Sequence, residues 1–280
     1  MILAENIALC RGNKTIFEPA SFRFDSPEFV AIIGPNGAGK STLLQLLSGY
    51  FPPTAGSVTI HKKQADKWQP NELARLRAYL QQQQSVFESF SVEDVLMMGR
   101  SIYMHSHPKN LDQELVTDAL TNLNLVHRKN EPFNQFSGGE QQRIQFARTL
   151  LQLDETGTES LVGKTLFLDE PLNNLDLYYQ YNLLQMARER VVNRGGTVIA
   201  VLHDLNMVYQ FADRVIVLSG GKTLIDSPTE EAMVPELLST IYQLTIKKIQ
   251  LENQLPYFAV MNLSTSQKQI KHERELTNHY

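Results

Sequence analysis

The sequence predicts a doubly wound α/β fold with a helical insert, and two patterns lead to that prediction. First, short apolar runs bounded by turn residues alternate with helical patterns, as in a parallel sheet covered by helices. Second, residues from about 85 to 150 are mostly helical in pattern, so this stretch interrupts the alternation. The expected strands are FVAII (29–33), TLFLD (165–169), TVIAVL (197–202) and RVIVL (214–218), and the insert helices are 91–100, 111–123 and 140–153.

The remaining segments complete this expectation. From Ile2 to about Ser57 the chain has shorter strand-like pieces, and residues 57–60 (SVTI) are expected to pair with them. Gly220 and Gly221 suit a hairpin turn after the last apolar run. The loop 154–164 is polar and expected to be exposed, and the tail from about residue 264 is polar and charged.

Composition limits the classes of function. The 280 residues are 42% apolar and 20% charged, which is enough for a packed core. A net charge of −4 disfavours nucleic acid as the main partner. Cys10 is the only cysteine, so an intramolecular disulfide and a cysteine-rich zinc site are excluded. No run approaches the roughly 20 apolar residues of a membrane span, and no signal peptide is evident, so we expect a cytoplasmic protein whose membrane attachment requires a partner.

A glycine-rich loop between a predicted strand and a predicted helix is the most specific motif. Its sequence, GPNGAGKST, fits the pattern G-x-x-x-x-G-K-[ST]. Glycines allow successive N–H groups to point at phosphate oxygens, and the following helix adds the positive end of its dipole. We therefore expect phosphate binding, with the lysine on the β- and γ-phosphates and the serine hydroxyl on Mg²⁺. The residues are Gly34, Pro35, Asn36, Gly37, Ala38, Gly39, Lys40, Ser41 and Thr42.

Two adjacent carboxylates, Asp169 and Glu170, follow the apolar run 165–169. Ligands of open α/β sheets bind at the carboxyl ends of the strands. Beside a phosphate loop, Asp169 is expected to hold Mg²⁺ through water, and Glu170 to polarise the attacking water. By itself the pair would suit a solvated acidic turn better than a metal site.

A third motif, FSGGEQQR, spans residues 136–143. Ser137 and Glu140 fit a capping box that opens an amphipathic helix. Capping does not explain Gly138 and Gly139, which would expose the N–H groups of a helix start and form a second anion site.

Together these motifs resemble the ABC (ATP-binding cassette) ATPases over about residues 3 to 262. The resemblance implies a P-loop NTPase (RecA-like) core with an N-terminal antiparallel β subdomain and a helical insert. It also implies one ATPase domain over 1–263, followed by the tail 264–280. His203 matches the family's switch histidine, Asp176 its D-loop aspartate, and Gln82 the glutamine-loop residue that joins Ser41 and Asp169 at Mg²⁺.

The chain departs from the family at three positions. Phe136 and Glu140 stand where the signature usually reads LSGGQ. Arg11 stands where an aromatic residue usually stacks on adenine, and a guanidinium can stack on a base in its place.

A narrower resemblance is to the ATPases of vitamin B12, iron-siderophore and hemin importers, with the hemin group closest. It is carried by the segments 65–82, 90–100 and 175–180 and by the polar loop 154–164. Vitamin B12 and ferric siderophores remain alternative cargoes. Two further classes stay open, namely exporter cassettes and soluble ABC ATPases of DNA repair or translation. The soluble class usually carries paired cassettes, coiled-coil inserts or zinc cysteines, and this sequence has none of these.

The resemblance also implies partners. Two copies would pair head to tail, so that Ser137, Gly138, Gly139 and Glu140 of one copy close over ATP held by the other. Transmembrane permease subunits would anchor the pair at the cytoplasmic face of the inner membrane, and a substrate-binding protein would act indirectly. A groove near residues 83–103 would receive the permease. Its candidate apolar contacts are Phe87, Phe90, Met97 and Met98, although the two methionines equally suit the core of the insert.

Overall fold

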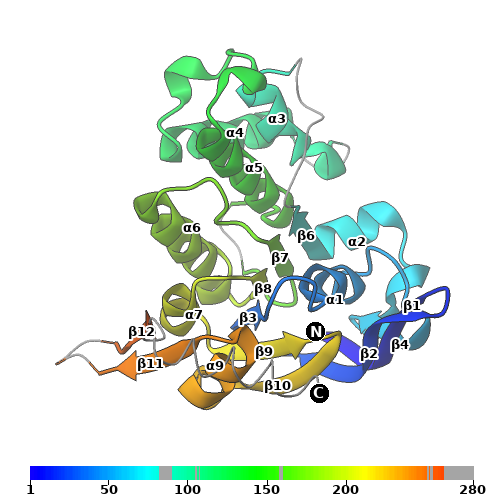
Figure 1. The fold of residues 1–280 in the computed structure, drawn as a ribbon. Coiled ribbons are helices and arrows are strands. Elements are labelled where there is room, and N and C mark those ends of the chain that lie inside the picture. The colour runs from blue at the N-terminus through cyan, green and yellow to red at the C-terminus, as the bar shows by residue number, and fades with distance from the viewer. Residues whose placement is uncertain are drawn as a thin grey trace, which may run out of the picture.

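The structure, a computed structural model, describes residues 1–81, 90–104, 106, 108–157, 160–250, 252 and 255–261. Its centre is a six-stranded sheet in the order β10-β9-β3-β8-β7-β6 (Figure 1). Five strands are parallel, and β10 pairs antiparallel with β9 after the turn at Gly220 and Gly221. The strands are β3 (Phe29–Ile33), β6 (Arg77–Leu80), β7 (Thr165–Asp169), β8 (Thr197–Val201), β9 (Arg214–Ser219) and β10 (Lys222–Pro228). The predicted α/β core is confirmed.

Both faces of this sheet are buried. Strand side chains alternate between faces, and in β3 Phe29, Ala31 and Ile33 join one hydrophobic cluster while Val30 and Ile32 join another. All five are fully buried, which explains why the sequence of this strand is continuously apolar. The covering helices include α1 (Lys40–Leu47), α6 (Leu177–Arg190), α7 (Leu205–Phe211), α8 (Thr229–Ala232) and α9 (Pro235–Tyr242).

An N-terminal antiparallel sheet packs beside this core, in the order β2-β1-β4-β5. The expected pairing of residues 57–60 is confirmed, since Ile60 lies opposite Ile2. The strands are β1 (Ile2–Arg11), β2 (Lys14–Phe24), β4 (Ala55–Ile60) and β5 (Lys63–Gln64), followed by η1 (Ala65–Lys67) and α2 (Pro70–Leu76).

The helical insert forms a separate lobe at the top of Figure 1 with its own hydrophobic cluster. Its elements are α3 (Val92–Met98), η2 (Ser101–Tyr103), α4 (Lys109–Asn122), η3 (Val126–Arg128), η4 (Phe133–Gln135) and α5 (Gly138–Leu153). The three predicted helices are therefore confirmed, with bounds that shift by at most two residues.

The loop 154–164 is more firmly anchored than its polar sequence predicts. Leu161 is 2% exposed and belongs to the main core, and Asp154 pairs with Arg194 of η5 (Val192–Arg194). The fully buried Arg100 donates hydrogen bonds to the carbonyl oxygens of Asp154 and Glu155. The expectation of an exposed loop is wrong for these residues, because a buried guanidinium needs acceptors and the loop backbone supplies them.

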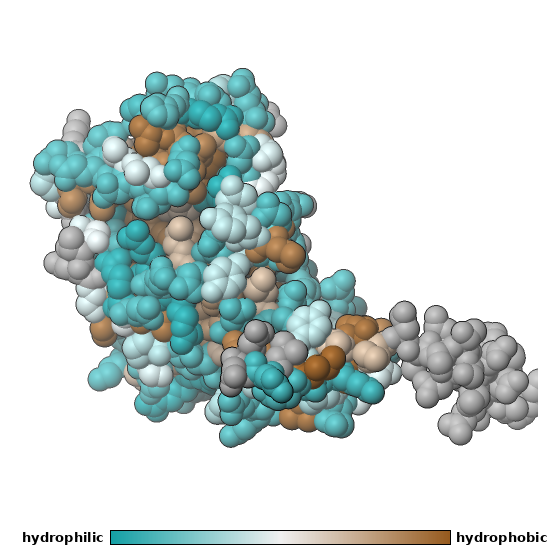
Figure 2. Space-filling view, turned by 90° about the vertical axis from the view of Figure 1, so that its left-hand side faces the viewer, coloured by the Kyte–Doolittle hydropathy of each residue, from teal (hydrophilic) through white to brown (hydrophobic). Residues whose placement is uncertain are grey.

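A C-terminal hairpin that the sequence did not predict follows α9. It consists of β11 (Thr245–Ile249) and β12 (Tyr257–Met261), and it projects from the core to the left of α7 in Figure 1. Asn206 of α7 holds it, since its side chain bonds both the N–H and the carbonyl oxygen of Phe258. Figure 2 shows hydrophobic surface in the region of this hairpin. Val260 of β12 is 59% exposed. The predicted tail 264–280 lies outside the described residues.

Candidate active site

The glycine-rich loop connects β3 to α1 and depends on glycine at two positions. Gly34 has a φ of 148°, and a Cβ there would collide with the carbonyl oxygen of Leu218. Gly39 caps the N-terminus of α1 in the left-handed conformation, with a φ of 95°. Since other residues rarely adopt these conformations, the motif's glycines are a requirement of the backbone path. The loop thereby encloses the start of α1.

Lys40 lies inside this loop and is 5% exposed. Its ammonium donates hydrogen bonds to the carbonyl oxygens of Gly34 (2.9 Å) and Pro35 (3.0 Å). Burial lowers the pKa of Lys40, while the charges of Glu170 and Asp169 act in the opposite direction. The loop therefore holds a buried cation beside two carboxylates, which suits a polyanionic ligand.

Asp169 ends β7 beside the loop and is 5% exposed. Ser41 donates a hydrogen bond to its Oδ1 (2.8 Å), and Tyr79 of β6 donates one to its Oδ2 (3.1 Å). Burial raises the pKa of Asp169, and the two hydrogen bonds partly oppose that effect. The predicted pair of Ser41 and Asp169 is thus brought into direct contact.

Glu170 has a φ of 50°, a left-handed conformation that is uncommon for a residue with a long side chain. His203 Nε2 lies 2.9 Å from its Oε1, and the Asn173 amide donates to its Oε2 at 2.9 Å. Burial alone would raise the pKa of Glu170, but the hydrogen bonds from His203 and Asn173 outweigh it and the net pKa is lowered. This geometry keeps Glu170 ionised and fixed in direction, as a proton acceptor requires.

One open cleft of about 660 Å³ is lined by Lys40, Ser41, Glu170, Asn173 and His203, whereas Asp169 is not among its lining residues. Gly34, Pro35 and Ala38 of the loop are not among its lining residues, and Ala38 is buried in the core. Arg11 is exposed at the end of β1 and does not line the cleft either, whereas Ile16 of β2 does. The full lining is Ile16, Asn36, Gly37, Gly39, Lys40, Ser41, Thr42, Glu170, Asn173 and His203.

Ser137 caps the N-terminus of α5 in the lobe, and the predicted capping box is present. Ser137 Oγ accepts from the Glu140 N–H at 3.3 Å, and Glu140 Oε2 accepts from the Ser137 N–H at 2.9 Å. Arg128 holds the other carboxylate oxygen of Glu140 at 2.9 Å and packs over the ring of Phe136. Glu140 therefore fixes the turn, and its direct nucleotide contact stays a prediction.

Gly138 and Gly139 follow at the start of α5, where they pack against the D-loop of the same chain. A Cβ on Gly139 would lie 2.9 Å from the carbonyl oxygen of Asn174, so glycine is needed there. None of the residues 137–140 lines the Lys40 cleft. A single chain thus places the two predicted anion sites apart.

The residues predicted near the permease groove divide in two groups. Gln82 and Phe87 lie outside the described residues. Phe90 is 42% exposed, while Met97 and Met98 pack against the hydrophobic cluster of the insert. The two methionines thus contribute to the core of the lobe, as the second interpretation of their sequence pattern expects.

Three residues of this site were not predicted: Ile16, Tyr79 and Asn173. Tyr79 sits in RAYL, a four-residue strand too short to be recognised from its pattern. Asn173 follows the acidic pair by three residues, a spacing that a turn after Glu170 would have suggested. Ile16 had no distinguishing pattern.

The side chains fit a magnesium ion. Ser41 in the cleft and the buried Asp169 beside it supply oxygen ligands of the kind that Mg²⁺ prefers. Within the described ranges, no group of three His, Cys, Asp or Glu side chains could hold a metal by itself. A site with few protein ligands suits Mg²⁺, which keeps waters and binds substrate phosphates.

Comparisons with known proteins agree with this geometry. A family model described as ABC transporter matches residues 17–173. A hemin import ATP-binding protein of Bradyrhizobium diazoefficiens is 40% identical over 244 residues, covering 87% of this chain and 89% of the relative. Another from Rhodopseudomonas palustris (strain BisB18) is 37% identical over 266 residues, covering 95% and 97%.

A solved structure described as a metal-chelate type ABC transporter in an inward-facing conformation has a TM-score of 0.75 at 25% identity. It covers 95% of this chain and 98% of that chain.

The chain therefore belongs to the ABC transporter family. Within that family it is an importer-type subunit that binds and hydrolyses ATP, as the fold and the relatives agree. A soluble ATPase of DNA repair or translation is not favoured by these relatives. No helix in the described part of the chain is long and apolar enough to cross a membrane.

Proposed function

We propose that this chain powers the import of hemin, as the ATPase subunit that works in pairs beneath a membrane permease. The observation that carries the mechanism is the single cleft holding Lys40, Ser41, Glu170 and His203, with Asp169 hydrogen-bonded to Ser41 at its edge. The cargo rests on the hemin import proteins to which the chain is similar along most of its length.

Residues 34–42 form the phosphate cradle in this proposal. Backbone N–H groups of the loop and of the start of α1 donate to phosphate oxygens, and Lys40 exchanges its two carbonyl partners for the β- and γ-phosphates. Ile16 gives the nucleotide an apolar contact at the mouth of the cleft. Arg11 stays the candidate for stacking on adenine, through movement of its exposed side chain.

Ser41, Asp169 and Gln82 would hold Mg²⁺, which neutralises charge on the phosphate oxygens when bound. The Ser41 hydroxyl can offer a lone pair to a ligand while its O–H continues to donate a hydrogen bond to Asp169 Oδ1. Asp169 then acts on the metal site through the serine and through water.

Glu170 is the proposed general base. Its lowered pKa keeps it ionised, and it accepts a proton from the water that attacks the γ-phosphorus. His203 and Asn173 hold one carboxylate oxygen each, so the acceptor direction is fixed before ATP arrives. The strained φ at Glu170 is consistent with a backbone that the surrounding structure holds for function.

A second copy of the chain completes each site. Ser137, Gly138 and Gly139 start α5 away from the cleft of their own chain, so they are available to the γ-phosphate of a partner's ATP. Glu140 contributes by fixing Ser137. Two ATP molecules would then join two chains head to tail, and hydrolysis would release them.

The rest of the proposal concerns assembly. Residues 1–263 act as one ATPase domain, with 264–280 as a tail. Permease subunits hold the pair at the cytoplasmic face of the inner membrane, and a substrate-binding protein delivers cargo. The net charge of −4 argues against nucleic acid as a partner.

The test is to reconstitute the chain in liposomes together with its own membrane subunits and its own substrate-binding protein. ATP hydrolysis and cargo accumulation are measured side by side for hemin, cobalamin and a ferric siderophore, with Glu170→Gln as the inactive control. We expect hemin to stimulate hydrolysis and to accumulate. A response to cobalamin or the siderophore without one to hemin would refute hemin as the cargo. The proposed importer mechanism would not be affected by that result.

A further inference from the structure

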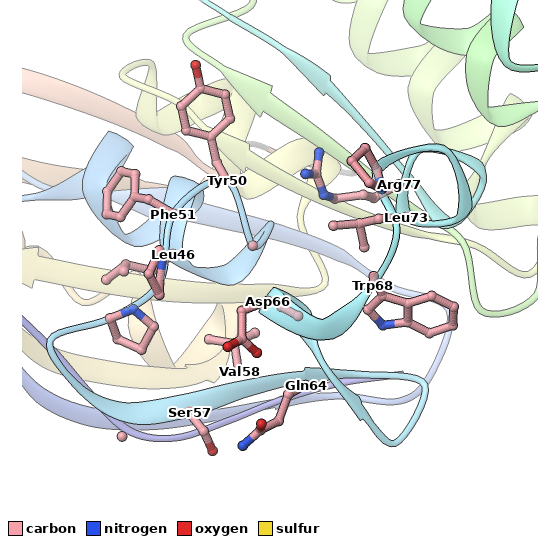
Figure 3. A pocket seen from close by; sticks show the side chains of 16 residues that line it. Leu46, Tyr50, Phe51, Ser57, Val58, Gln64, Asp66, Trp68, Leu73 and Arg77 are labelled. Atoms are coloured by element: carbon pink, nitrogen blue, oxygen red, sulfur yellow. The ribbon is translucent and has the colours of Figure 1, made fainter.

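Tyr79 belongs to β6, which contributes no predicted site residue, yet its side chain reaches the active site. Its ring stacks on Phe167 at 6.2 Å with an interplanar angle of 18°, and Tyr50 lies against it at 6.2 Å between centroids. Tyr50 lines a separate cavity of about 520 Å³ between α1, β4 and α2, where Figure 3 labels it with Arg77. The ring of Tyr79 is therefore held between a core residue and the wall of a surface cavity.

The hydroxyl of Tyr79 donates to Asp169 Oδ2 at 3.1 Å, while Ser41 donates to Oδ1 at 2.8 Å. Each oxygen of a carboxylate that is only 5% exposed thus has its own donor. Two donors from opposite sides fix the plane of the carboxylate, and this orientation keeps Oδ1 toward Ser41. Without the phenol, Oδ2 would lose its hydrogen bond in a place that water hardly reaches.

We infer that Tyr79 is a positioning residue for the metal site: it orients Asp169 so that Ser41 and Asp169 can serve Mg²⁺ together. The inference rests on the proposed role of Asp169. Partners of metal-site ligands set ligand direction, and removing one costs about 10-fold to 100-fold in metal affinity. Phe167 and Tyr50 pack against the ring of Tyr79 and hold it in place. Its hydroxyl therefore has little freedom to follow a rotation of the Asp169 carboxylate.

The positioning role predicts a change in the Mg²⁺ concentration that the site requires, with no change in the affinity for metal-free ATP. Tyr79 lines no part of the nucleotide cleft, and Lys40 is held by loop carbonyls. Tyr79→Phe should therefore leave the affinity for metal-free ATP unchanged. The Mg²⁺ concentration that half-saturates the tightening of ATP binding should rise about tenfold.

The experiment measures ATP binding by calorimetry in the Glu170→Gln chain, first in EDTA and then across a Mg²⁺ titration. Tyr79→Phe is compared with Tyr103→Phe, which removes another buried phenol, one that donates to the Gln152 carbonyl oxygen in the lobe at 3.0 Å. We expect the Mg²⁺ requirement to move in Tyr79→Phe alone. Adding Tyr79→Phe to Asp169→Asn should produce no further change, because the group it positions is already altered.

The outcomes separate this inference from the proposed function. A parent chain whose ATP binding ignores Mg²⁺ would refute the proposed metal site itself. A parent that responds to Mg²⁺, with Tyr79→Phe matching it, would overturn the positioning role alone. A Tyr79→Phe chain whose ATP binding is weakened in EDTA as much as in Mg²⁺ would also overturn the positioning role, since the phenol would then support the fold of the site in general.

Discussion

Replacing Glu170 by glutamine separates the chemistry of the site from its binding. The amide keeps the size of the side chain and can still contact His203 and Asn173, but it cannot accept a proton from water. General-base catalysis contributes about 10²-fold to 10⁴-fold, equivalent to about 3 to 5 kcal/mol of barrier. We expect the upper part of this range, because Glu170 is ionised and held by two hydrogen bonds at 2.9 Å.

ATP affinity should survive the change, since loop carbonyls hold Lys40 and Asp169 holds Ser41. The assay is phosphate release in a single turnover, with the affinity for ATP measured on the same samples. Glu72→Gln is the matched control, because this glutamate lies on the surface and makes only long contacts, with Lys63 Nζ and with the Gln69 N–H at 3.4 Å each. A Glu170→Gln chain that hydrolyses ATP at the parent rate would refute the reasoning.

Three further predictions address the fold and the site. Arg100→Met should lower the free energy of unfolding, measured in urea, by about 3–5 kcal/mol, because it leaves the buried Asp112 without its ion-pair partner. Arg23→Met removes an exposed ion pair and should cost at most about 1 kcal/mol. Equal losses would contradict the burial argument. Gly34→Ala should abolish ATP binding, since its Cβ meets a carbonyl oxygen, whereas Gly12→Ala faces open space and should cost about 1–2 kcal/mol of backbone strain while still binding ATP. Because the pKa of Glu170 is lowered in the folded protein, its ionised carboxylate stabilises the fold at pH values above the ordinary glutamate pKa of 4.5. This contribution disappears as the pH falls through the folded-state pKa. The difference in unfolding free energy between the parent and Glu170→Gln should therefore shrink on acidification, and a difference that grows would contradict the sign.

The core strands could be predicted because burial on both sheet faces leaves a continuous apolar run. In 29–33 the predicted and observed bounds coincide. The catalytic motifs could also be predicted from the sequence. The backbone path of the phosphate loop requires its glycines, and the acidic pair directly follows the apolar run of a strand. The capping box at Ser137 was also correct, because it depends only on local spacing.

Other features depend on contacts between distant segments. Arg100 is a polar residue in sequence, and only the fold shows that it binds the backbone of the loop after α5. Tyr79 looks like an ordinary strand residue until β6 pairs with β7 and brings its hydroxyl to Asp169. The hairpin β11–β12 lacks a strong turn pattern, and Asn206 of α7 supplies the contact that holds it.

The central claim is that each ATP site needs the cradle of one chain and the Ser137 turn of another. Mixing two mutant chains tests it directly, with Glu170→Gln in both to slow hydrolysis. A Ser137→Arg chain keeps its cradle but blocks a partner's γ-phosphate, and a Lys40→Ala chain keeps its Ser137 turn but loses the lysine. Only the mixed pair contains one intact site. Size-exclusion chromatography with ATP and Mg²⁺ should show a dimer in the mixture and in neither mutant alone. Monomers in all three samples, when the parent Glu170→Gln chain dimerises, would contradict shared sites.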